Sequence, residues 1–447
     1  MKISILPLVE DDSIVFVIIY LLFLLDNVLL TVVVPIIPDY LFSNELNVTI
    51  DANDLAPASL SPLQRKFHNL EIENGPLGIL LASKALVQLA FTPFIGYLVG
   101  VLGCYIPLLV GTFNLLLASI LFACGSTYGV LVLARALHGS ASAAIAVSGM
   151  SILAKKFPPT LRVKLMPIAF GGIASGVLIG YPLGGAVYQL LGKSAPFIFI
   201  SISIVICIIL QLRYLKEESS QCENHSSPNG FRDCIDLLKD HKTIIVVSTI
   251  CVSTSTMAIL EPCVPMWLMA RLDPLPTKWQ LGAVFIPDSV GYFIGSHFAG
   301  FLPVAPWRTS IIAMVIIGLS CYVLPLANTI SQLSLPHFGI GLGVGAVDAA
   351  LVPLLATFAD KRGGNHYGPI YALQQSSVSV SYSFGPLLGG LAVRLLGFCW
   401  VIRIVGFLNL LISPSLLELE EKPEIAPLIS TSTSTSSKFD EDKIFQK

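Results

Sequence analysis

Long apolar segments recur along the whole chain, separated by short polar stretches. Each segment is roughly 20 residues long, which is the length of helix that crosses about 30 Å of hydrocarbon. Backbone groups in lipid must find their hydrogen bonds within the segment itself, so we expect helices rather than strands. The sequence therefore predicts an all-α protein that crosses a membrane many times.

We expect twelve such helices, divided six and six by a polar interval. The first six lie near residues 14–36, 76–99, 104–124, 128–153, 165–191 and 194–213. The second six lie near residues 244–269, 279–302, 309–328, 333–357, 368–393 and 396–416. This spacing predicts an N-terminal half over 1–213 with a long loop at 39–75, a linker at 214–243, a C-terminal half over 244–416 and a disordered tail at 417–447.

The composition argues against several other classes of protein. Only 12% of the residues are charged, whereas soluble domains are about one quarter charged. The net charge of −2 provides no basic field for nucleic acid. The nine cysteines form neither a CxxC pair nor a pair spaced with histidine for zinc. We see no nucleophile–base pair, metal cluster or nucleotide loop, so we expect neither an enzyme nor a cofactor.

Lys and Arg residues in the loops predict the orientation, because cytoplasmic loops are enriched in them. With both termini in the cytoplasm, the inside loops hold twelve and the outside loops six. The loop 39–75 then lies on the lumenal side, and its NVT sequence makes Asn47 a candidate glycosylation site. The linker and tail lie in the cytoplasm, where Glu424, Leu428 and Ile429 fit the acidic dileucine pattern that sorting adaptors bind.

We single out six ionisable residues inside the predicted helices. A charge at the centre of a membrane helix costs about 2.5–3.5 kcal/mol on insertion scales, so such residues face a cavity, pair with one another or bind protons. They are Asp26, Lys84, Arg135, Glu261, Asp288 and Asp348. Their distribution over six helices predicts a shared central network.

Asp26 lies in IIYLLFLLDNVLLTVVVPIIPDYL, about 12 residues into its helix and hence near the midplane. A carboxylate there holds an organic ammonium or a proton, but not comfortably both, and this exclusion is the basis of proton/cation exchange. A structural ion pair with Lys84 is the alternative. We expect the adjacent Asn27 to line the same site.

Glu261 begins EPCVPMW, in which two prolines free backbone carbonyls and Trp267 offers an aromatic face to an ammonium. A kinked helix with a capped glutamate is the alternative. Asp348, in GAVDAALVP, is a candidate proton carrier or a hydrogen-bonding partner of a neighbouring helix. Arg135, in LARALHG, is either part of a gate or a side chain that reaches the outer surface.

The segment LLDNVLLTVVVPIIPDYL resembles the first helix of the vesicular monoamine transporters, a family of the major facilitator superfamily. ASKALVQL, LEPCVPMW, KWQLG, GAVDAALVP and YGPIYAL resemble segments of that family too, so the likeness extends from the first helix to the last. The resemblance implies the superfamily fold, with two six-helix halves. It also implies alternating access, in which lumenal protons exchange for a cytosolic biogenic monoamine at the membrane of secretory or synaptic vesicles.

The resemblance assigns roles to individual residues. It implies that Asp26 binds the amine, with Lys84 as its ionic partner, and that Glu261 lines the amine site. Asp348 would then help to carry protons. The remaining residues assigned in this way are Arg135 and Tyr292 in the central network and gate, and Tyr382 in an aromatic wall on the eleventh helix.

The chain also departs from that family. Gln375 stands where the family has an aspartate, Cys207 where an acid is usual, and Thr254 where an asparagine is usual. The loop GYLVGVLGCY lacks the usual basic residue of the superfamily. A glutamine does not titrate, so proton coupling stays open. Asp288, on the same helix face as Tyr292, either replaces some of the missing acidity or caps its helix.

Two other functions are compatible with the sequence. A transporter of the same fold could carry acetylcholine, a polyamine or another organic cation. A divergent, non-transporting paralogue could bind or sense a ligand. The buried charges argue against the second alternative, since a protein released from transport has no reason to keep them.

Overall fold

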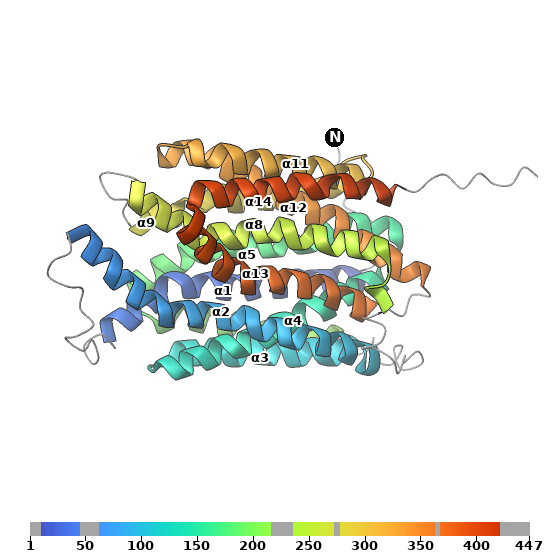
Figure 1. Ribbon diagram of the computed structural model, residues 1–447. Coiled ribbons are helices and arrows are strands. Elements are labelled where there is room, and N and C mark those ends of the chain that lie inside the picture. The colour runs from blue at the N-terminus through green and yellow to red at the C-terminus, as the bar shows by residue number, and fades with distance from the viewer. Residues whose placement is uncertain (1–9, 45–61, 216–235, 272–277, 363–366, 421–447) are drawn as a thin grey trace, which may run out of the picture.

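The computed structural model describes residues 10–44, 62–215, 236–271, 278–362 and 367–420, and these residues contain helices and no strand. Figure 1 shows long helices lying side by side along one direction, with α1 to α4 in the lower part of the view and α11, α12 and α14 in the upper part. Ten of the described helices are long and apolar enough to cross a membrane. The other two predicted segments correspond to the short α10 and to α13, which carries two glutamines among its serines.

Each of the twelve predicted segments falls on one or more helices. The first six are α1 (Glu10–Asn44), α2 (Pro62–Leu102), α3 (Tyr105–Cys124), α4 (Tyr128–Lys156), α5 (Pro159–Leu191) and α6 (Ser194–Tyr214). The others are α8 (His241–Arg271), α9 (Lys278–Ala283), α10 (Ile286–Phe298), η2 (Ala299–Phe301), α11 (Pro306–Val323), η3 (Leu324–Leu326), α12 (Ile330–Lys361), α13 (Tyr367–Leu396), α14 (Phe398–Ile412) and η4 (Ser413–Leu419).

The eighth predicted segment, 279–302, is not one continuous helix. The chain turns at Val284 and Phe285, between α9 and α10, and Pro287 lies at the start of α10. Proline has no backbone N–H, and its fixed φ suits the first turn of a helix, where that N–H would have no partner within the helix. The break places Asp288 in the first turn of α10.

Glycines allow close contact between the first six helices and the later ones. α2 packs against α13, and α5 packs against α10 and α12. A Cβ atom on Gly96 of α2 would lie 2.5 Å from the Cβ of Ala372 in α13, closer than side-chain atoms can approach. Only a glycine permits this approach, as is common where membrane helices cross.

One end of the bundle is joined by a polar cluster, here called the Arg162 cluster. Arg162 lies in the first turn of α5, Asp360 lies near the end of α12, and Tyr367 begins α13. Arg162 Nη1 lies 2.5 Å from Asp360 Oδ2, and Arg162 Nη2 donates to the Tyr367 hydroxyl at 3.0 Å. The Tyr367 hydroxyl in turn donates to Asp360 Oδ1. The cluster therefore ties α5 to α12 and α13 at this end.

Candidate functional site

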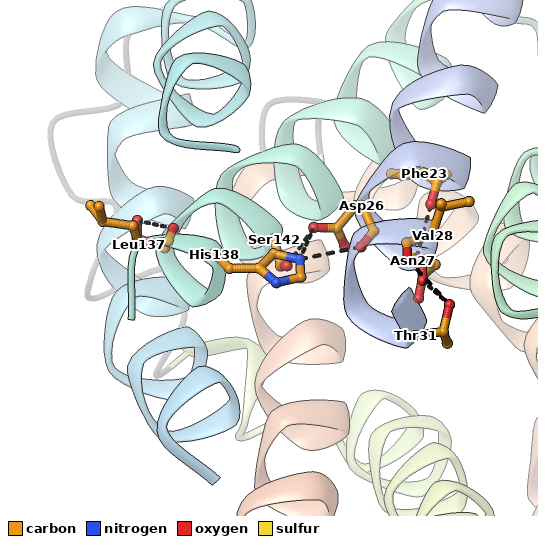
Figure 2. Close-up of polar contacts among 9 residues, drawn as sticks. Phe23, Asp26, Asn27, Val28, Thr31, Leu137, His138 and Ser142 are labelled. Carbon is orange, nitrogen blue, oxygen red and sulfur yellow. Dashed lines mark hydrogen bonds and ion pairs between the residues drawn. The ribbon is translucent and has the colours of Figure 1, made fainter. Parts of the chain in front are cut away.

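Asp26, in the middle of α1, is held by two side chains of α4. His138 Nε2 lies 3.1 Å from Asp26 Oδ1 and 3.2 Å from the backbone oxygen of Asp26. Ser142 donates its hydroxyl to the same Oδ1 at 2.6 Å, as Figure 2 shows. Because a backbone oxygen can only accept, Nε2 is the nitrogen of His138 that carries the proton and donates.

His138 is a site residue that the sequence analysis missed. Its side chain is fully buried, and its Nδ1 atom has no hydrogen-bond partner. The sequence did contain a signal, since His138 is an ionisable residue in an apolar helix. It lies one turn after Arg135 and one turn before Ser142, which places all three near one helix face.

Asn27 points away from the contacts of Asp26. Its Nδ2 donates to the backbone oxygen of Phe23 at 2.9 Å, as drawn in Figure 2. Its Cβ lies against α5, where a Cβ atom on Gly176 would be only 2.8 Å away. The structure therefore brings Asp26, but not Asn27, to α4, and Asn27 packs α1 against α5.

Lys84 lies near Asp26 without being its direct partner. It is buried in α2, and its charge interacts with those of Asp26, Arg135 and Glu261. Among the ion pairs of the described residues, Asp26 is joined to His138 and not to Lys84. The direct ionic partner expected from the resemblance is thus replaced by a histidine, and Lys84 acts at longer range.

Arg135 lies inside the bundle and does not reach the outer surface. Only 1% of it is exposed, which rules out the surface position considered from the sequence. Its Nε and Nη1 atoms have no hydrogen-bond partner, and its charge interacts with that of Glu261. Arg135 is therefore a buried cation in a polar interior, and Glu261 is the carboxylate whose charge acts on it.

Glu261, in α8, lies in the same polar interior. The charges of Arg135 and Lys84 act on it, so it lies deep among the helices. It nevertheless keeps a large accessible surface. A side chain that is both enclosed and accessible lines an internal cavity. Tyr181, Asp288 and Tyr382 interact electrostatically with Glu261 and are partly accessible, which places them around the same cavity.

Tyr292 and Asp348 form a second polar pair between α10 and α12. The Tyr292 hydroxyl donates to Asp348 Oδ2 at 2.9 Å, while Asp348 Oδ1 is buried without a partner. Asp288 precedes Tyr292 by one turn of α10, and its backbone oxygen packs on Gly341 of α12. Asp288 lies in the first turn of α10, and its charge and that of Glu261 act on each other.

Trp267 is not brought to the acidic residues. Its indole stacks on Phe398 of α14 with 4.8 Å between ring centroids. The guanidinium of Arg271 lies 5.1 Å from the same indole. These contacts indicate a packing role for Trp267 at the junction of α8 and α14.

Several predicted features lie outside the described residues or carry no contact with the site. Asn47, Glu424, Leu428 and Ile429 fall outside the described ranges. Gln375 and Cys207 are buried, in α13 and α6. Within the described part of the chain, no three His, Cys, Asp or Glu side chains are grouped closely enough to hold a metal ion.

Comparison with known proteins agrees with this architecture. The family model of the Major Facilitator Superfamily matches residues 16–270. The fold is similar to the human organic anion transporter MFSD10, with a TM-score of 0.75 over 92% of this chain and 100% of that chain at 15% identity.

Curated relatives match nearly the whole chain. The chromaffin granule amine transporter of Rattus norvegicus is 32% identical, over 93% of this chain and 89% of its own. The human synaptic vesicular amine transporter is 33% identical, over 91% and 88%. A probable vesicular acetylcholine transporter of Danio rerio is 34% identical, over 91% and 79%.

The fold and the charged cavity define a membrane transporter rather than an enzyme. The chain belongs to the vesicular amine transporter family of the major facilitator superfamily. The family and the apolar helices together identify a multi-pass vesicle membrane protein that transports a small molecule.

Proposed function

We propose that the protein is a proton-coupled antiporter that loads a biogenic monoamine from the cytosol into secretory or synaptic vesicles. The observation that carries this proposal is the arrangement of Asp26. Both of its side-chain hydrogen bonds within the described residues fall on Oδ1, which leaves Oδ2 available. A carboxylate oxygen without a donor at mid-membrane is a strong site for a protonated amine.

The cavity at Glu261 supports an aromatic amine as the cargo. Tyr181 and Tyr382 border it, and tyrosine faces attract both aromatic rings and ammonium groups. A primary ammonium can donate N–H to Asp26 Oδ2, whereas the quaternary ammonium of acetylcholine has no N–H to donate. This difference favours a monoamine, although acetylcholine transporters are among the relatives.

Buried carboxylates support proton coupling, because an amine and a proton would compete for them. Asp26 would hold either the amine or a proton. Asp348, bonded to Tyr292, would carry protons at a separate place in the cavity. Alternating access would follow from rocking of the two six-helix halves, with the Arg162 cluster closing the cytosolic end.

The same proposal includes the orientation predicted from the loops. Both termini would lie in the cytosol, so Asn47 would face the lumen as a glycosylation site. The tail motif at Glu424, Leu428 and Ile429 would be available to sorting adaptors. The excess of Lys and Arg in the predicted inside loops supports this arrangement.

Reconstitution of the full chain in liposomes tests the proposal. Vesicles with an acidic interior should accumulate labelled serotonin or dopamine, and collapsing the pH gradient should abolish accumulation. Acetylcholine and spermidine are tested in parallel as competing cargoes. The Asp26→Asn variant should lose uptake, because an amide cannot balance the ammonium charge.

The outcomes separate the alternatives. Uptake of acetylcholine or spermidine in preference to the monoamines would reject the proposed cargo. Amine uptake that does not respond to the gradient would reject proton coupling. A protein that takes up none of these cations would reject transport of amines altogether and favour a binding or sensing role.

A further inference from the structure

His138 is placed at the point where cargo and protons would meet. Its Nε2 atom donates to Asp26 Oδ1, the oxygen that Ser142 also binds, while its Nδ1 atom is buried with no partner (Figure 2). An imidazole needed only to position Asp26 would normally have its second nitrogen satisfied as well. The unpaired Nδ1 leaves His138 a nitrogen that no protein group occupies and that can accept a proton.

The charges around His138 make it sensitive to a cation on Asp26. The side chains whose charges act on it are Asp26 from α1, Lys84 from α2 and Arg135 from its own helix. α3, α5 and α13 also pack against α4, and none of their side chains is among these charges. A protonated His138 is therefore opposed first by its burial and then by two fixed cations, and it is stabilised by one carboxylate.

We propose that His138 is a proton-carrying residue of the transport cycle, which gives up its proton when an amine binds Asp26. In the amine-free state, Asp26 would pair with the imidazolium of His138. An arriving ammonium would take Asp26 Oδ2 and add a further positive charge beside Lys84. The imidazolium would then release the proton of Nδ1 to the cavity and remain as a neutral imidazole that donates through Nε2.

The return step uses the same atoms in reverse. A proton from the acidic lumen would add to Nδ1, restore the imidazolium and compete with the ammonium for Asp26. The amine would then leave into the lumen. One proton bound by His138 is thus exchanged for one amine held by Asp26, and this provides a titrating group in a chain whose eleventh predicted helix has Gln375.

This inference rests on the proposed antiport, and proton counting on the purified full chain tests it. Serotonin is added to the protein in weakly buffered detergent at several pH values, and both the protons released and the dissociation constant are measured. Each displaced proton makes the dissociation constant change tenfold per pH unit. We expect the His138→Gln variant to release up to one proton fewer per amine bound. Its dissociation constant should then change by up to tenfold less per pH unit than that of the wild type.

Two other variants serve as comparisons. His241 forms a surface ion pair with Glu418 at 2.7 Å, so His241→Gln removes a histidine–carboxylate pair outside the cavity and should leave the proton count unchanged. Ser142→Ala removes a hydrogen bond from Asp26 Oδ1 while leaving His138 in place. Ser142→Ala should weaken binding several-fold and keep the wild-type proton count. If His138 had a purely structural role, His138→Gln would also keep the wild-type proton count.

The results separate this inference from the proposed function. Wild-type protein that binds and transports serotonin, with an unchanged proton count in His138→Gln, overturns only the role of His138. Wild-type protein that binds no amine overturns both. If His138→Gln does not fold, nitrogen-15 NMR of histidine in the wild-type protein decides, because the His138 signal should change protonation state on adding serotonin and an unchanged signal overturns the inference.

Discussion

The imidazole of His297 in α10 occupies the space that a side chain at Gly171 of α5 would fill. A Cβ atom on Gly171 would lie 1.9 Å from His297 Cε1. His297 is held in this position by a hydrogen bond between its Nδ1 and the backbone oxygen of Phe293, at 2.9 Å. The contact between α5 and α10 therefore depends on a glycine on one helix and an imidazole on the other.

Gly171→Ala should destabilise this contact by about 1–3 kcal/mol, the usual cost of overpacking. The double variant Gly171→Ala, His297→Ala should recover most of the loss, since the obstructing ring is gone. Thermal unfolding in detergent measures both. Gly185 is the control in the same helix, because a Cβ atom there would meet nothing within 4 Å. Equal effects at Gly171 and Gly185 would contradict the steric explanation.

Asp360→Asn should weaken the Arg162 cluster. Arg162 keeps 9% and Asp360 30% of its side chain exposed, so the pair lies between buried and surface ion pairs. We therefore expect a loss of about 1–3 kcal/mol in stability. The control is Asp236→Asn, since the exposed pair of Asp236 and Lys239 should contribute less than about 1 kcal/mol. A loss no larger than the control would mean that the cluster does not hold the helices together.

Tyr292→Phe should reduce gradient-driven uptake. The change removes the one hydrogen bond that Asp348 makes within the described residues, at 2.9 Å. A hydrogen bond to a charged group is worth about 1.5–3 kcal/mol, so we expect initial rates to fall roughly tenfold or more. Tyr322, which is exposed on α11, provides the matched control Tyr322→Phe. Unchanged uptake in Tyr292→Phe would remove Asp348 from the coupling scheme.

Trp267→Ala should lower stability and leave amine affinity within about twofold of wild type. Its indole stacks on Phe398, and aromatic pairs contribute about 0.5–1.5 kcal/mol beyond the apolar area that they bury. Binding of labelled amine and thermal unfolding are measured on the same preparation. A tenfold loss of affinity with normal stability would instead support the amine-site role expected from the sequence.

The sequence predicted the helices well because membrane spans impose length and polarity on each segment. This reasoning was too coarse at Pro287, where one apolar segment contains two helices, whereas Pro262 and Pro265 lie within the continuous α8. The ionisable residues were identified because charge is rare in such segments. Which of them touch depends on helix packing, and for that reason the partner of Asp26 proved to be His138 rather than Lys84. The directions of Asn27 and Trp267 could not be predicted for the same reason.

The approach of Gly96 to Ala372 has a consequence for how tightly the vesicle is sealed. Protons cross proteins along files of water, and a contact in which even one added carbon would clash has no room for such a file. If a larger residue held α2 and α13 apart, water could enter between the two helices. In the antiporter proposed above, a leak of this kind would dissipate the proton gradient without moving cargo, so the missing side chain at Gly96 would help to keep the barrier between α2 and α13 closed to water.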